Sequence, residues 1–434
     1  MNCMKVMFTT LGCKVNQYDT QTLKELFVRE GFSLCEKGET PDVVIVNTCT
    51  VTAESDRKGR QTVSRFAKKY PNAVIGVTGC MPQACPEKGE KLEKAQVVVG
   101  CASNVKLPAL IKEYLQNGKR MIAVEPHQNA PVTDGLCSES FEGRTRAFVK
   151  IEDGCNRFCS YCLIPYARGR VRSKPLCELK KELTRLGENG YKEVVLAGIN
   201  LTAYSPEEGV DLSHAVALAQ ENPHIERIRL GSMEPDQFTP QMIQNLAKNS
   251  KLCPQFHLSL QSGSDTVLAR MNRHYNTAFY FDLITNLRKV FPECAITTDV
   301  MCGFPGETEE EAKETIAFMK KVGFAKVHAF AYSPREGTPA AAMKNQVPPA
   351  VKKQRMERLL QTAEEGATAF MKVLIGQTVP VLLERKKEDG LWEGHTPHYV
   401  PVGVEVPAGK AGEICLVTIT QIQGERCIGK LTNK

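Results

Sequence analysis

The sequence predicts an α/β protein built from three parts: a doubly wound α/β domain, an incomplete TIM-like barrel and a small antiparallel β module. Three observations predict this order. Short apolar runs alternate with helical patterns over roughly the first 115 residues, a second alternating series begins near residue 146, and short strand patterns split by turns fill the tail from residue 377. A chain of 434 residues is also long enough for two or three domains.

The first series predicts a parallel sheet with helices between its strands. β-Rich runs alternate with stretches of helical composition at residues 20–30 and 54–69. The β-rich runs are residues 5–10, 43–47, 74–78 and 96–99. This order is typical of a doubly wound, flavodoxin-like fold, which we assign to residues 1–118. Residues 119–143 contain Pro126, Pro131 and Gly135 but few apolar runs, so they are expected to form a linker.

The second series predicts a partial (β/α)6 barrel over residues 144–374. Its six strand candidates are residues 147–151, 193–197, 227–230, 255–260, 295–301 and 326–330. Helical stretches separate them, and one opens with Thr308 and Glu311 in the pattern of a capping box. A long helical segment at residues 351–374 follows the last strand. Six units are fewer than the eight of a complete TIM barrel, so the barrel is expected to be incomplete.

The tail, residues 375–434, changes from helical to strand periodicity. Strand-like runs at residues 379–383, 399–406, 413–422 and 426–431 are split by glycine, proline and charged turns. A small antiparallel β module is the expected result.

Composition restricts the class of protein and its surroundings. With 42% hydrophobic and 24% charged residues, the chain has the balance of a soluble globular protein. Its net charge of +7 is compatible with a nucleic-acid partner and equally with a generic basic surface. No apolar run is long enough to span a bilayer and no signal peptide is visible, so we expect a cytoplasmic protein without a membrane partner. Seventeen cysteines, an odd number, argue against a disulfide framework and favour metal binding or catalysis.

Cys155, Cys159 and Cys162 are the strongest functional signal in the sequence. Their C-x3-C-x2-C spacing lets three thiolates hold three irons of a cubane iron–sulfur cluster, while the fourth iron stays open to a small molecule. Cys155 comes just after the first predicted barrel strand, at the end where such barrels place their active sites. The alternative is a structural zinc site, but no fourth ligand lies close in sequence.

A second set of cysteines follows strands of the first series. Cys13, Cys49 and Cys80 each come directly after an apolar run. Since the ends of parallel strands meet at one edge of a sheet, the three can converge and hold a second cluster. The alternative is that they are buried cysteines that pack as small hydrophobic residues. Cys101 also follows a strand and Cys85 lies nearby, so strand position alone leaves the choice of ligands open.

At Cys155, Cys159 and Cys162 the chain resembles the radical S-adenosylmethionine enzymes, which share this spacing with an aromatic residue, here Tyr161, before the last cysteine. The resemblance implies that S-adenosylmethionine binds the open iron and is cleaved to a 5′-deoxyadenosyl radical. It also implies cofactor contacts at the ends of later strands, although the acidic residue common at the glycine-rich edge is absent; the alternative is ordinary strand-end turns. The residues at these positions are Gly198, Asn200, Ser232, Glu234, Asp299 and Gly303.

Strings around the second cysteine set resemble the methylthiotransferases, a subfamily of those enzymes. They are Leu-Gly-Cys-Lys-Val-Asn at residues 11–16, Asn-Thr-Cys at 47–49 and Thr-Gly-Cys-Met-Pro-Gln at 78–83. The string Ile-Pro-Tyr-Ala-Arg-Gly-Arg-Val-Arg-Ser at residues 164–173 matches the same subfamily. The resemblance implies a second, auxiliary 4Fe–4S cluster held by Cys13, Cys49 and Cys80.

The tail resembles the TRAM domain, a small β module that grips RNA. Residues 394–399, Gly-His-Thr-Pro-His-Tyr, match its signature turn, and several lysines and arginines give the tail a basic character. The resemblance implies RNA contacts at His395 and the stacking of a base on Tyr399. The alternative is a satisfied surface histidine and a solvated basic face.

Residues 11–20, Leu-Gly-Cys-Lys-Val-Asn-Gln-Tyr-Asp-Thr, are similar to the branch that methylthiolates threonylcarbamoyladenosine beside the tRNA anticodon. That branch implies tRNA as partner, S-adenosylmethionine and two 4Fe–4S clusters as cofactors, and an electron donor such as flavodoxin or ferredoxin. Arg335 is a candidate for the threonyl carboxylate, with a structural arginine pair as the alternative. The competing interpretations are the branches that modify isopentenyladenosine or a ribosomal-protein aspartate, and a non-catalytic RNA-binding iron–sulfur sensor.

Overall fold

The computed structural model describes residues 3–127 and 144–432, which divide into two compact units. The N-terminal unit contains residues 3–127, 148–175 and 333–341. The C-terminal unit contains residues 144–147, 176–332 and 342–432.

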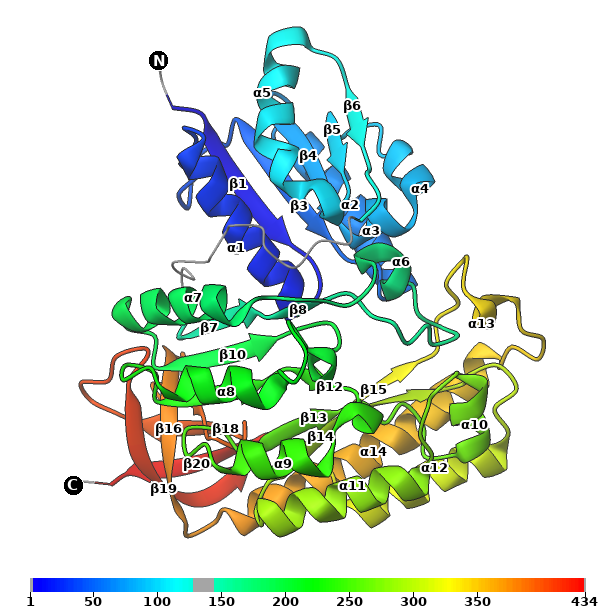
Figure 1. Cartoon of the computed structure of the whole chain (residues 1–434), viewed down its shortest axis with the longest axis vertical. Helices are drawn as coiled ribbons and strands as arrows, with labels where there is room; N and C mark the ends of the chain where they lie inside the picture. Colours follow the sequence, from blue (N-terminus) through cyan, green and yellow to red (C-terminus); the bar gives the residue numbers. More distant parts are fainter. Residues whose placement is uncertain (1–2, 128–143, 433–434) are drawn as a thin grey trace. The chain divides into compact units, whose positions relative to one another are not determined.

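A six-stranded parallel sheet forms the core of the N-terminal unit, with strand order β2-β1-β3-β4-β5-β6 (Figure 1). The strands are β1 (Lys5–Thr10), β2 (Ser33–Leu34), β3 (Val43–Thr48), β4 (Val74–Gly79), β5 (Val97–Val99) and β6 (Met121–Ala123). Every residue of β3 and β4 is buried. A parallel strand covered on both faces needs apolar residues at successive positions, which explains the unbroken apolar runs in the sequence.

Helices cover both faces of this sheet. On one face, α1 (Lys14–Arg29) and α5 (Leu107–Asn117) contribute to a hydrophobic cluster with Val43 and Ile45 of β3. On the other, α2 (Ala53–Lys69) and the short α3 (Cys80–Ala84) contribute to a cluster with Val44 and Val46. Alternate residues of a strand point to opposite faces, so the two clusters lie on opposite sides. The predicted doubly wound fold is confirmed.

The N-terminal unit also contains the segment with the C-x3-C-x2-C motif. Two short antiparallel strands, β8 (Glu152–Asp153) and β9 (Arg172–Ser173), flank the segment, and helix α6 (Ile164–Arg168) lies between them in sequence. α6 packs against α3 at the end of β4. The cysteine motif therefore belongs to the same compact unit as the six-stranded sheet.

The C-terminal unit is built on a wall of parallel strands. β10 (Glu193–Ala197) pairs with β11 (Arg227–Leu230), while β12 (Ser232–Met233), β13 (Gln255–Leu258), β14 (Ala295–Cys302) and β15 (Lys326–Ala331) pair in that order. An isolated backbone bridge pairs Ile228 of β11 with Leu252, which precedes β13. β7 (Arg146–Lys150) is also present where the sequence predicts a strand. The predicted incomplete barrel is confirmed.

Helices follow the strands of this wall. They are α7 (Leu176–Glu188), α8 (Leu212–Gln220), α9 (Pro240–Ala247), α11 (Thr277–Val290), α12 (Glu309–Val322) and the long α14 (Pro349–Val373), which packs on β15 and α12. The predicted capping box is present at the start of α12. The Thr308 hydroxyl accepts from the N–H of Glu311 at 3.2 Å, and the Glu311 carboxylate accepts from the N–H of Thr308 at 2.8 Å.

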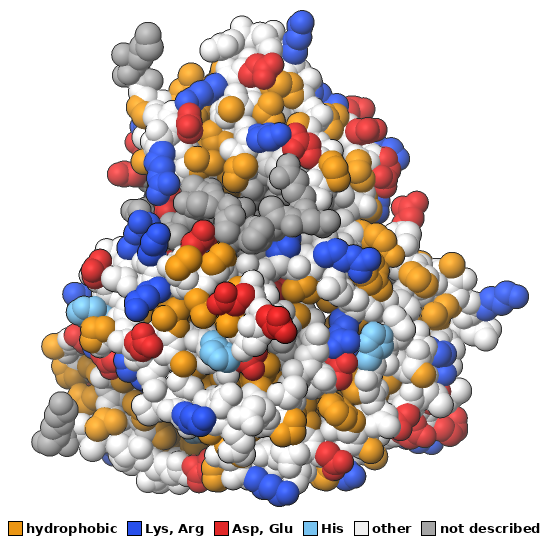
Figure 2. Space-filling view, viewed as in Figure 1, with side chains coloured by type: hydrophobic (Ala, Val, Ile, Leu, Met, Phe, Trp, Pro, Cys, Tyr) orange, Lys and Arg blue, Asp and Glu red, His pale blue; other side chains and the backbone are white. Residues whose placement is uncertain are grey.

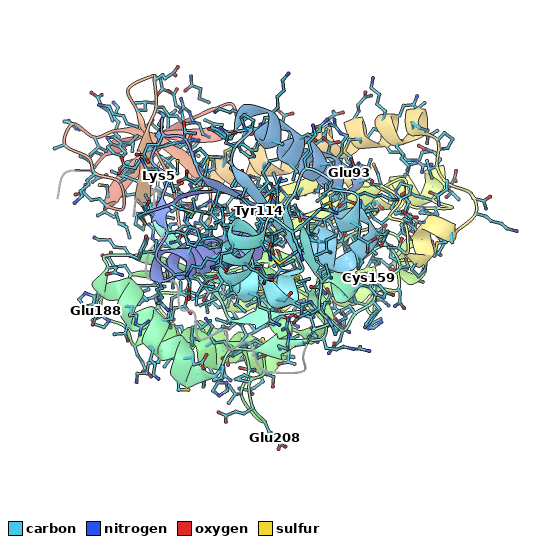
Figure 3. The ribbon with its side chains drawn as sticks, turned by 90° about the horizontal axis from the view of Figure 1, so that it is seen from above. Lys5, Glu93, Tyr114, Cys159, Glu188 and Glu208 are labelled. Carbon is cyan, nitrogen blue, oxygen red and sulfur yellow. The ribbon has the colours of Figure 1, made fainter. Side chains whose placement is uncertain are left out.

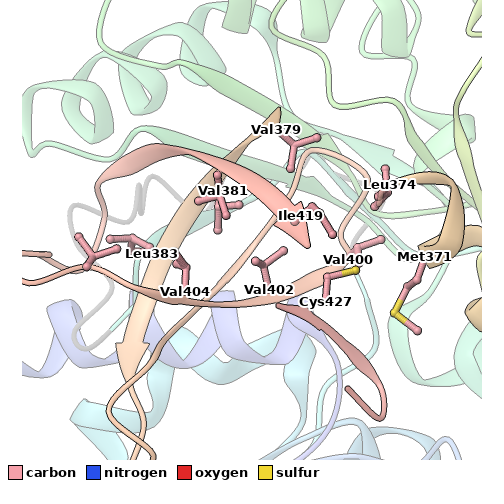
Figure 4. Close-up of a cluster of buried hydrophobic side chains, with 12 residues drawn as sticks. Met371, Leu374, Val379, Val381, Leu383, Val400, Val402, Val404, Ile419 and Cys427 are labelled. Atoms are coloured by element: carbon pink, nitrogen blue, oxygen red, sulfur yellow. The ribbon is translucent and has the colours of Figure 1, made fainter. Parts of the chain in front are cut away.

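The residues after α14 form a small closed barrel with strand order β16-β17-β18-β20-β19. Its strands are β16 (Thr378–Lys386), β17 (Trp392–His395), β18 (Pro401–Glu405), β19 (Ile414–Gln423) and β20 (Arg426–Leu431). Aliphatic side chains, among them Val381, Val402 and Ile419, fill it (Figure 4). The predicted antiparallel module needs one correction, because β18 and β20 run parallel. An odd number of strands cannot alternate in direction around a closed ring.

The predicted linker, residues 119–143, includes a strand. β6 pairs with β5 and extends the N-terminal sheet, while Pro131 and Gly135 lie outside the described residues. The two compact units also divide the chain differently from the ranges 1–118, 144–374 and 375–434, so those domain ranges stay a prediction. Within the described ranges, none of the helices is both long and apolar enough to cross a membrane.

Candidate iron–sulfur and cofactor sites

Cys13, Cys49 and Cys80 lie together at the carboxyl edge of the N-terminal sheet. Cys13 precedes the first turn of α1, Cys49 follows β3, and Cys80 follows β4 as the first residue of α3. A Cβ atom at Gly12 would lie 3.0 Å from Cys49 Sγ, so the chain passes very close to that thiol. The side-chain oxygen of Asn16 lies 3.8 Å from Cys13 Sγ and 3.7 Å from Cys80 Sγ. The structure thus brings these three predicted residues to one place.

Asn16 joins the strand ends that carry these thiols. It is fully buried, and its amide nitrogen donates to the carbonyl oxygens of Leu11 and Thr48, each at 2.9 Å. The side chain of Asn47 donates in turn to the carbonyl oxygen of Asn16 at 3.0 Å. A single amide in the first turn of α1 therefore fixes the loops after β1 and β3. In the sequence, Asn16 is visible only as part of the string at residues 11–16, and its role in joining the loops follows from the structure.

A buried ion network reaches the same thiols. Arg168 Nε donates to Cys80 Sγ across 3.3 Å, and Arg168 Nη1 donates to Asp19 at 2.7 Å and to Asp153 at 3.2 Å. Lys150 Nζ lies 2.7 Å from the Asp19 carboxylate. All four charged side chains are buried, where an unpaired charge would be costly. Burial alone would raise the pKa of Asp153, but Arg168 and Lys150 hold it well below its usual range.

Cys101 adjoins Cys80. The hydrogen bond from the Cys101 thiol, helped by the charge of Arg168, lowers the pKa of Cys80 to about 7 against the opposing effect of burial. Burial raises the pKa of Cys49 to about 11. The Cys101 thiol also lies 2.9 Å from the carbonyl oxygen of Ala167 in α6.

The donor set at this edge fits an iron–sulfur cluster. Across residues 3–127 and 144–432, no three His, Cys, Asp or Glu side chains are arranged to hold a single metal ion. A 4Fe–4S cluster makes a different demand, because each thiolate binds its own iron. Cys13, Cys49 and Cys80 come from three separate loops. Cys13 and Cys80 both lie near the side-chain oxygen of Asn16, and Arg168 supplies an N–H donor to sulfur.

Cys155, Cys159 and Cys162 lie on a tight loop between β8 and α6. The loop begins at Gly154, whose φ is +92°. A Cβ atom at this position would lie 2.0 Å from the carbonyl oxygen of Arg170, so only glycine fits here. Cys159, labelled in Figure 3, is buried, whereas Cys155 and Cys162 are partly exposed.

Backbone N–H groups are directed at two of these thiols. The N–H of Arg157 lies 3.5 Å from Cys155 Sγ, and the N–H of Ile164 lies 3.4 Å from Cys162 Sγ. Hydrogen bonds to the sulfurs are one of the ways in which a protein stabilises a thiolate-bound cluster. The loop therefore has the ligands and the donors that an iron–sulfur cluster needs, and the partly exposed Tyr161 lies within it.

The predicted S-adenosylmethionine contacts lie along the wall of the C-terminal unit. Gly198 and Asn200 follow β10, Ser232 and Glu234 lie in and just after β12, Asp299 lies within β14, and Gly303 follows β14. Apart from Asp299, they stand at carboxyl ends of parallel strands, the edge at which barrels of this kind build their sites. These assignments stay predictions.

Two of these polar side chains are held by neighbours in the C-terminal unit. Asn200 Nδ2 donates to Gln237 Oε1 at 2.8 Å. The Glu234 carboxylate pairs with Arg273 at 2.6 Å, and both groups are nearly buried. Each neighbour limits the directions in which Asn200 and Glu234 can meet a ligand.

Asp299 forms a pair that sequence analysis missed. Its carboxylate lies 3.2 Å from His257 Nε2, and His257 Nδ1 lies 3.0 Å from the Thr297 hydroxyl. Burial opposes ionisation of Asp299, but the bond to His257 keeps the pKa of Asp299 below its usual range. His257 sits in β13 one strand away, a relationship that strand pairing reveals and local sequence does not.

Arg335 has a structural partner in the N-terminal unit. It is 4% exposed, and its guanidinium donates to Asp56 at 2.8 Å and to the Thr50 hydroxyl at 2.7 Å. Cys85, the other open candidate for a cluster ligand, lies near the same ion pair. The structure thus shows the buried arginine pair that was the alternative interpretation, and the suggested role in binding a threonyl carboxylate stays a prediction.

His395 and Tyr399 are engaged by groups of the C-terminal unit. Their rings stack with centroids 4.5 Å apart, and His395 Nδ1 hydrogen-bonds to Glu384. The guanidinium of Arg229 lies 4.7 Å from the centre of the Tyr399 ring, and that of Arg146 lies 5.3 Å away. Both rings thus contact protein groups of the strand wall, and the RNA contacts expected at His395 and Tyr399 stay predictions.

A buried carboxylate, that of Glu193, holds the arginines that contact the Tyr399 ring. Glu193 of β10 lies 2.9 Å from Arg146 and 3.0 Å from Arg229. Burial would raise the pKa of Glu193, but Arg229 and Arg146 lower it to about 2. Arg227 donates to the carbonyl oxygens of His395 and Pro380. The turn at residues 394–399 is therefore bound by arginine side chains of the same unit.

The surface carries both signs of charge. On the face that Figure 2 shows, Lys and Arg side chains alternate with Asp and Glu side chains.

Two protein-family models match the chain. One, described as uncharacterized protein family UPF0004, matches residues 5–100, and the other, described as the radical SAM superfamily, matches residues 149–319. The radical S-adenosylmethionine methyltransferase TsrM from Kitasatospora setae, solved with cobalamin and a 4Fe–4S cluster, superposes with a TM-score of 0.56 at 15% identity over 78% of this chain and 77% of that chain. That likeness concerns the fold. The class of protein is thus the radical S-adenosylmethionine enzymes.

Curated relatives narrow this class. The chain is 38% identical to threonylcarbamoyladenosine tRNA methylthiotransferase MtaB of Bacillus subtilis over 95% of this chain and 93% of that protein. It is 35% identical to MtaB of Thermotoga maritima over 98% and 96%. It is also 34% identical to tRNA-2-methylthio-N6-dimethylallyladenosine synthase of Pelotomaculum thermopropionicum over 89% and 88%. The chain belongs to the radical S-adenosylmethionine tRNA methylthiotransferase family.

Proposed function

We propose that this chain converts N6-threonylcarbamoyladenosine in tRNA, at the position 3′-adjacent to the anticodon, to its 2-methylthio form. Relatives whose names carry this substrate match nearly the whole chain at 35–38% identity. Lys14 and Val15 stand where the isopentenyladenosine branch typically has Gln-Met, which supports the same choice.

One observation carries the chemical part of the proposal: helix α6 touches both cysteine sets. Its first residue, Ile164, directs an N–H at Cys162 Sγ, and its last residue, Arg168, donates to Cys80 Sγ. A five-residue helix is short and stiff, so the two sets are held at a fixed separation within one compact unit. Two reactive centres that must act on one carbon atom require this arrangement.

We assign one cluster to each set. Cys155, Cys159 and Cys162 are the proposed ligands of the cluster that binds S-adenosylmethionine, and Cys13, Cys49 and Cys80 those of the auxiliary cluster. When bound, the cofactors supply an electron to cleave S-adenosylmethionine to a radical, and the sulfur and methyl group destined for adenine C2. The chain contributes the thiolates and the N–H donors to sulfur, and it buries Cys49, Cys80 and Cys159.

The cofactor contacts are proposed from the same resemblance. Tyr161 lies within the first cysteine loop, and polar groups at the strand ends of the C-terminal unit offer hydrogen bonds to the methionine, ribose and adenine parts. These residues are Gly198, Asn200, Ser232, Glu234, Asp299 and Gly303. Except for Asp299, which lies within β14, they stand at carboxyl ends of the parallel strands, and this placement supports the assignment.

The proposed partners are tRNA and an electron donor of the flavodoxin or ferredoxin class, and the proposed location is the cytoplasm. We also propose that residues 1–118 act as the auxiliary-cluster domain, 144–374 as the radical domain and 375–434 as an RNA-gripping TRAM domain. Basic residues in the tail, among them Lys386 and Lys410, remain available for phosphate contacts and are exposed.

A second candidate substrate is isopentenyladenosine, because relatives named for dimethylallyladenosine match at 34% identity. The two are separated by offering the reconstituted enzyme tRNA that carries one modification or the other. We expect a mass gain on the threonylcarbamoyl nucleoside alone. Gain on the isopentenyl nucleoside instead would transfer the proposal to that branch.

The same assay separates the two clusters. Cys159→Ala should abolish both 5′-deoxyadenosine release and product, because the radical cannot form. Cys49→Ala should retain 5′-deoxyadenosine release but lose the methylthio product. Cys177→Ala, at an exposed cysteine in α7, is the matched control and should behave as wild type. Methylthio product from Cys49→Ala would disprove the auxiliary assignment.

A further inference from the structure

We propose that Arg168 is a positioning residue that sets the reduction potential of the auxiliary cluster. This inference rests on the proposed function, specifically on Cys13, Cys49 and Cys80 as the ligands of that cluster. Arg168 touches none of the reacting atoms in the described structure; it acts through the thiol of Cys80 and the amide of Asn16.

The guanidinium of Arg168 uses each of its nitrogens for a different partner. Nε donates to Cys80 Sγ at 3.3 Å, Nη1 donates to Asp19 at 2.7 Å, and Nη2 donates to the side-chain oxygen of Asn16 at 2.5 Å. That oxygen is the atom within 3.8 Å of Cys13 Sγ and 3.7 Å of Cys80 Sγ. The planar fork of arginine therefore fixes the amide oxygen that lies near both Cys13 and Cys80.

Arg168 is the cation that pairs with both buried carboxylates of this site and also contacts a thiol. Asp19 and Asp153 supply two buried carboxylates, and Arg168 and Lys150 supply two buried cations. Arg168 stands on the side that faces Cys80, so the cationic end of the network points at the proposed cluster. Loss of this cation would leave the two carboxylates opposite Lys150 and the less buried Arg172, whose Nη2 lies 3.8 Å from Asp153.

The potential of an iron–sulfur cluster depends on nearby net charge and on hydrogen bonds to its sulfurs. Reduction adds a negative charge to the cluster, so a neighbouring cation and an N–H donor favour the reduced state. Arg168 supplies both at 1% exposure, where water screens the charge little. Its removal should therefore make the cluster harder to reduce.

The test isolates the auxiliary cluster by changing Cys155, Cys159 and Cys162 to Ala in the full chain. Iron content and an anaerobic one-electron redox titration, followed by electron paramagnetic resonance, are compared for this background and for Arg168→Gln and Arg168→Lys made in it. Arg120→Lys is the matched control, since the Arg120 guanidinium donates to the carbonyl oxygens of Glu90, Leu92 and Ala95 in the same unit.

We expect Arg168→Gln to bind iron and to lower the equilibrium constant for reduction at least tenfold, about 59 mV for a one-electron couple. Arg168→Lys, which keeps the charge but loses the fork, should shift the potential less, and Arg120→Lys should leave it unchanged. A folded, iron-loaded Arg168→Gln with the background potential would overturn the inference.

If Arg168→Gln fails to fold, the double change Asp19→Asn with Arg168→Gln replaces it, because it removes one carboxylate together with the cation. A wild-type potential in that variant would also overturn the inference, and a lowered potential would support it. Absence of any cluster in the triple-alanine background would instead contradict the proposed ligands, so the two failures are distinguishable.

Discussion

Arg229 and Tyr399 hold the small β-barrel on the strand wall of the C-terminal unit. The Arg229 guanidinium lies 4.7 Å from the centre of the Tyr399 ring and also donates to the carbonyl oxygen of Pro397 at 2.9 Å. The turn at residues 394–399 is thus bound by an arginine from β11. A motif that sequence resemblance links to RNA has a structural task inside this chain.

Tyr399→Ala should therefore lower stability more than RNA affinity. Loss of the stacking and cation–π contacts should cost about 2 kcal/mol, whereas the tRNA affinity of the folded protein should stay close to wild type. Urea unfolding and a tRNA binding titration measure the two effects. Tyr399→Phe keeps the ring and is the control; a large loss of affinity without loss of stability would restore the RNA-stacking role.

Glu193→Gln should destabilise the C-terminal unit at neutral pH. The carboxylate faces Arg146, Arg227 and Arg229, and its pKa is lowered to about 2 from an ordinary 4.5. This difference corresponds to about 3 kcal/mol. Because the folded-state pKa is depressed, the stabilisation is complete above the unfolded pKa and is lost as pH falls from about 4.5 towards 2. The gap in unfolding free energy between wild type and variant should narrow over that range; a gap independent of pH would refute the ion network.

Arg335→Ala should act on stability and leave tRNA recognition intact. Removing Arg335 leaves Lys88, with its Nζ 3.7 Å away, as the remaining cationic partner of the buried Asp56 carboxylate, so the cost should be about 3 kcal/mol, the lower end for a broken buried pair. The double variant with Asp56→Ala should be less destabilised than the sum of the single changes, since the poorly paired carboxylate is gone. Denaturant unfolding and the KM for modified tRNA give the readouts. A raised KM in a fully folded Arg335→Ala protein would return this residue to the substrate site.

Gly154→Ala should eliminate the cluster of the C-x3-C-x2-C loop and spare the auxiliary one. The added methyl meets a carbonyl oxygen at 2.0 Å, and the φ of +92° adds strain of about 1–3 kcal/mol. Gly118→Ala is a matched control, because its φ is +66° and a Cβ there meets no described atom within 4 Å. Iron analysis and cofactor cleavage should separate the two variants. Equal loss of activity in both variants would mean that backbone strain at positive φ, and not the clash with the carbonyl oxygen, causes the loss.

The sequence predicted most strands because apolar runs are local signals. β10 and β11 have the predicted bounds, whereas β17 was missed, since Gly394 and charged neighbours hide its alternation. α1 begins at Lys14, six residues before the predicted helix. Its first turns contain Asn16 and Asp19, which are polar but buried. Partners that are distant in sequence stabilise them, so the buried face of these turns lacks the apolar pattern by which a helix is predicted.

The site was predictable where a spacing carries chemistry. Both cysteine sets were named from the sequence, and the structure brings Cys13, Cys49 and Cys80 together at one sheet edge. Arg168 was visible only as part of a matching string, because its contact with Cys80 spans 88 positions. For Arg335 and Tyr399, residue type alone could not distinguish a ligand contact from a contact with another part of the protein.

Mass spectrometry of tRNA nucleosides from cells with and without this gene tests the proposed substrate and reaction together. We expect 2-methylthio-N6-threonylcarbamoyladenosine to disappear and its unthiolated parent to accumulate in cells without the gene. The wild-type gene should restore the methylthio nucleoside, and a Cys49→Ala copy should not. An unchanged level of the methylthio nucleoside in cells without the gene would show that this protein does not carry out the proposed reaction.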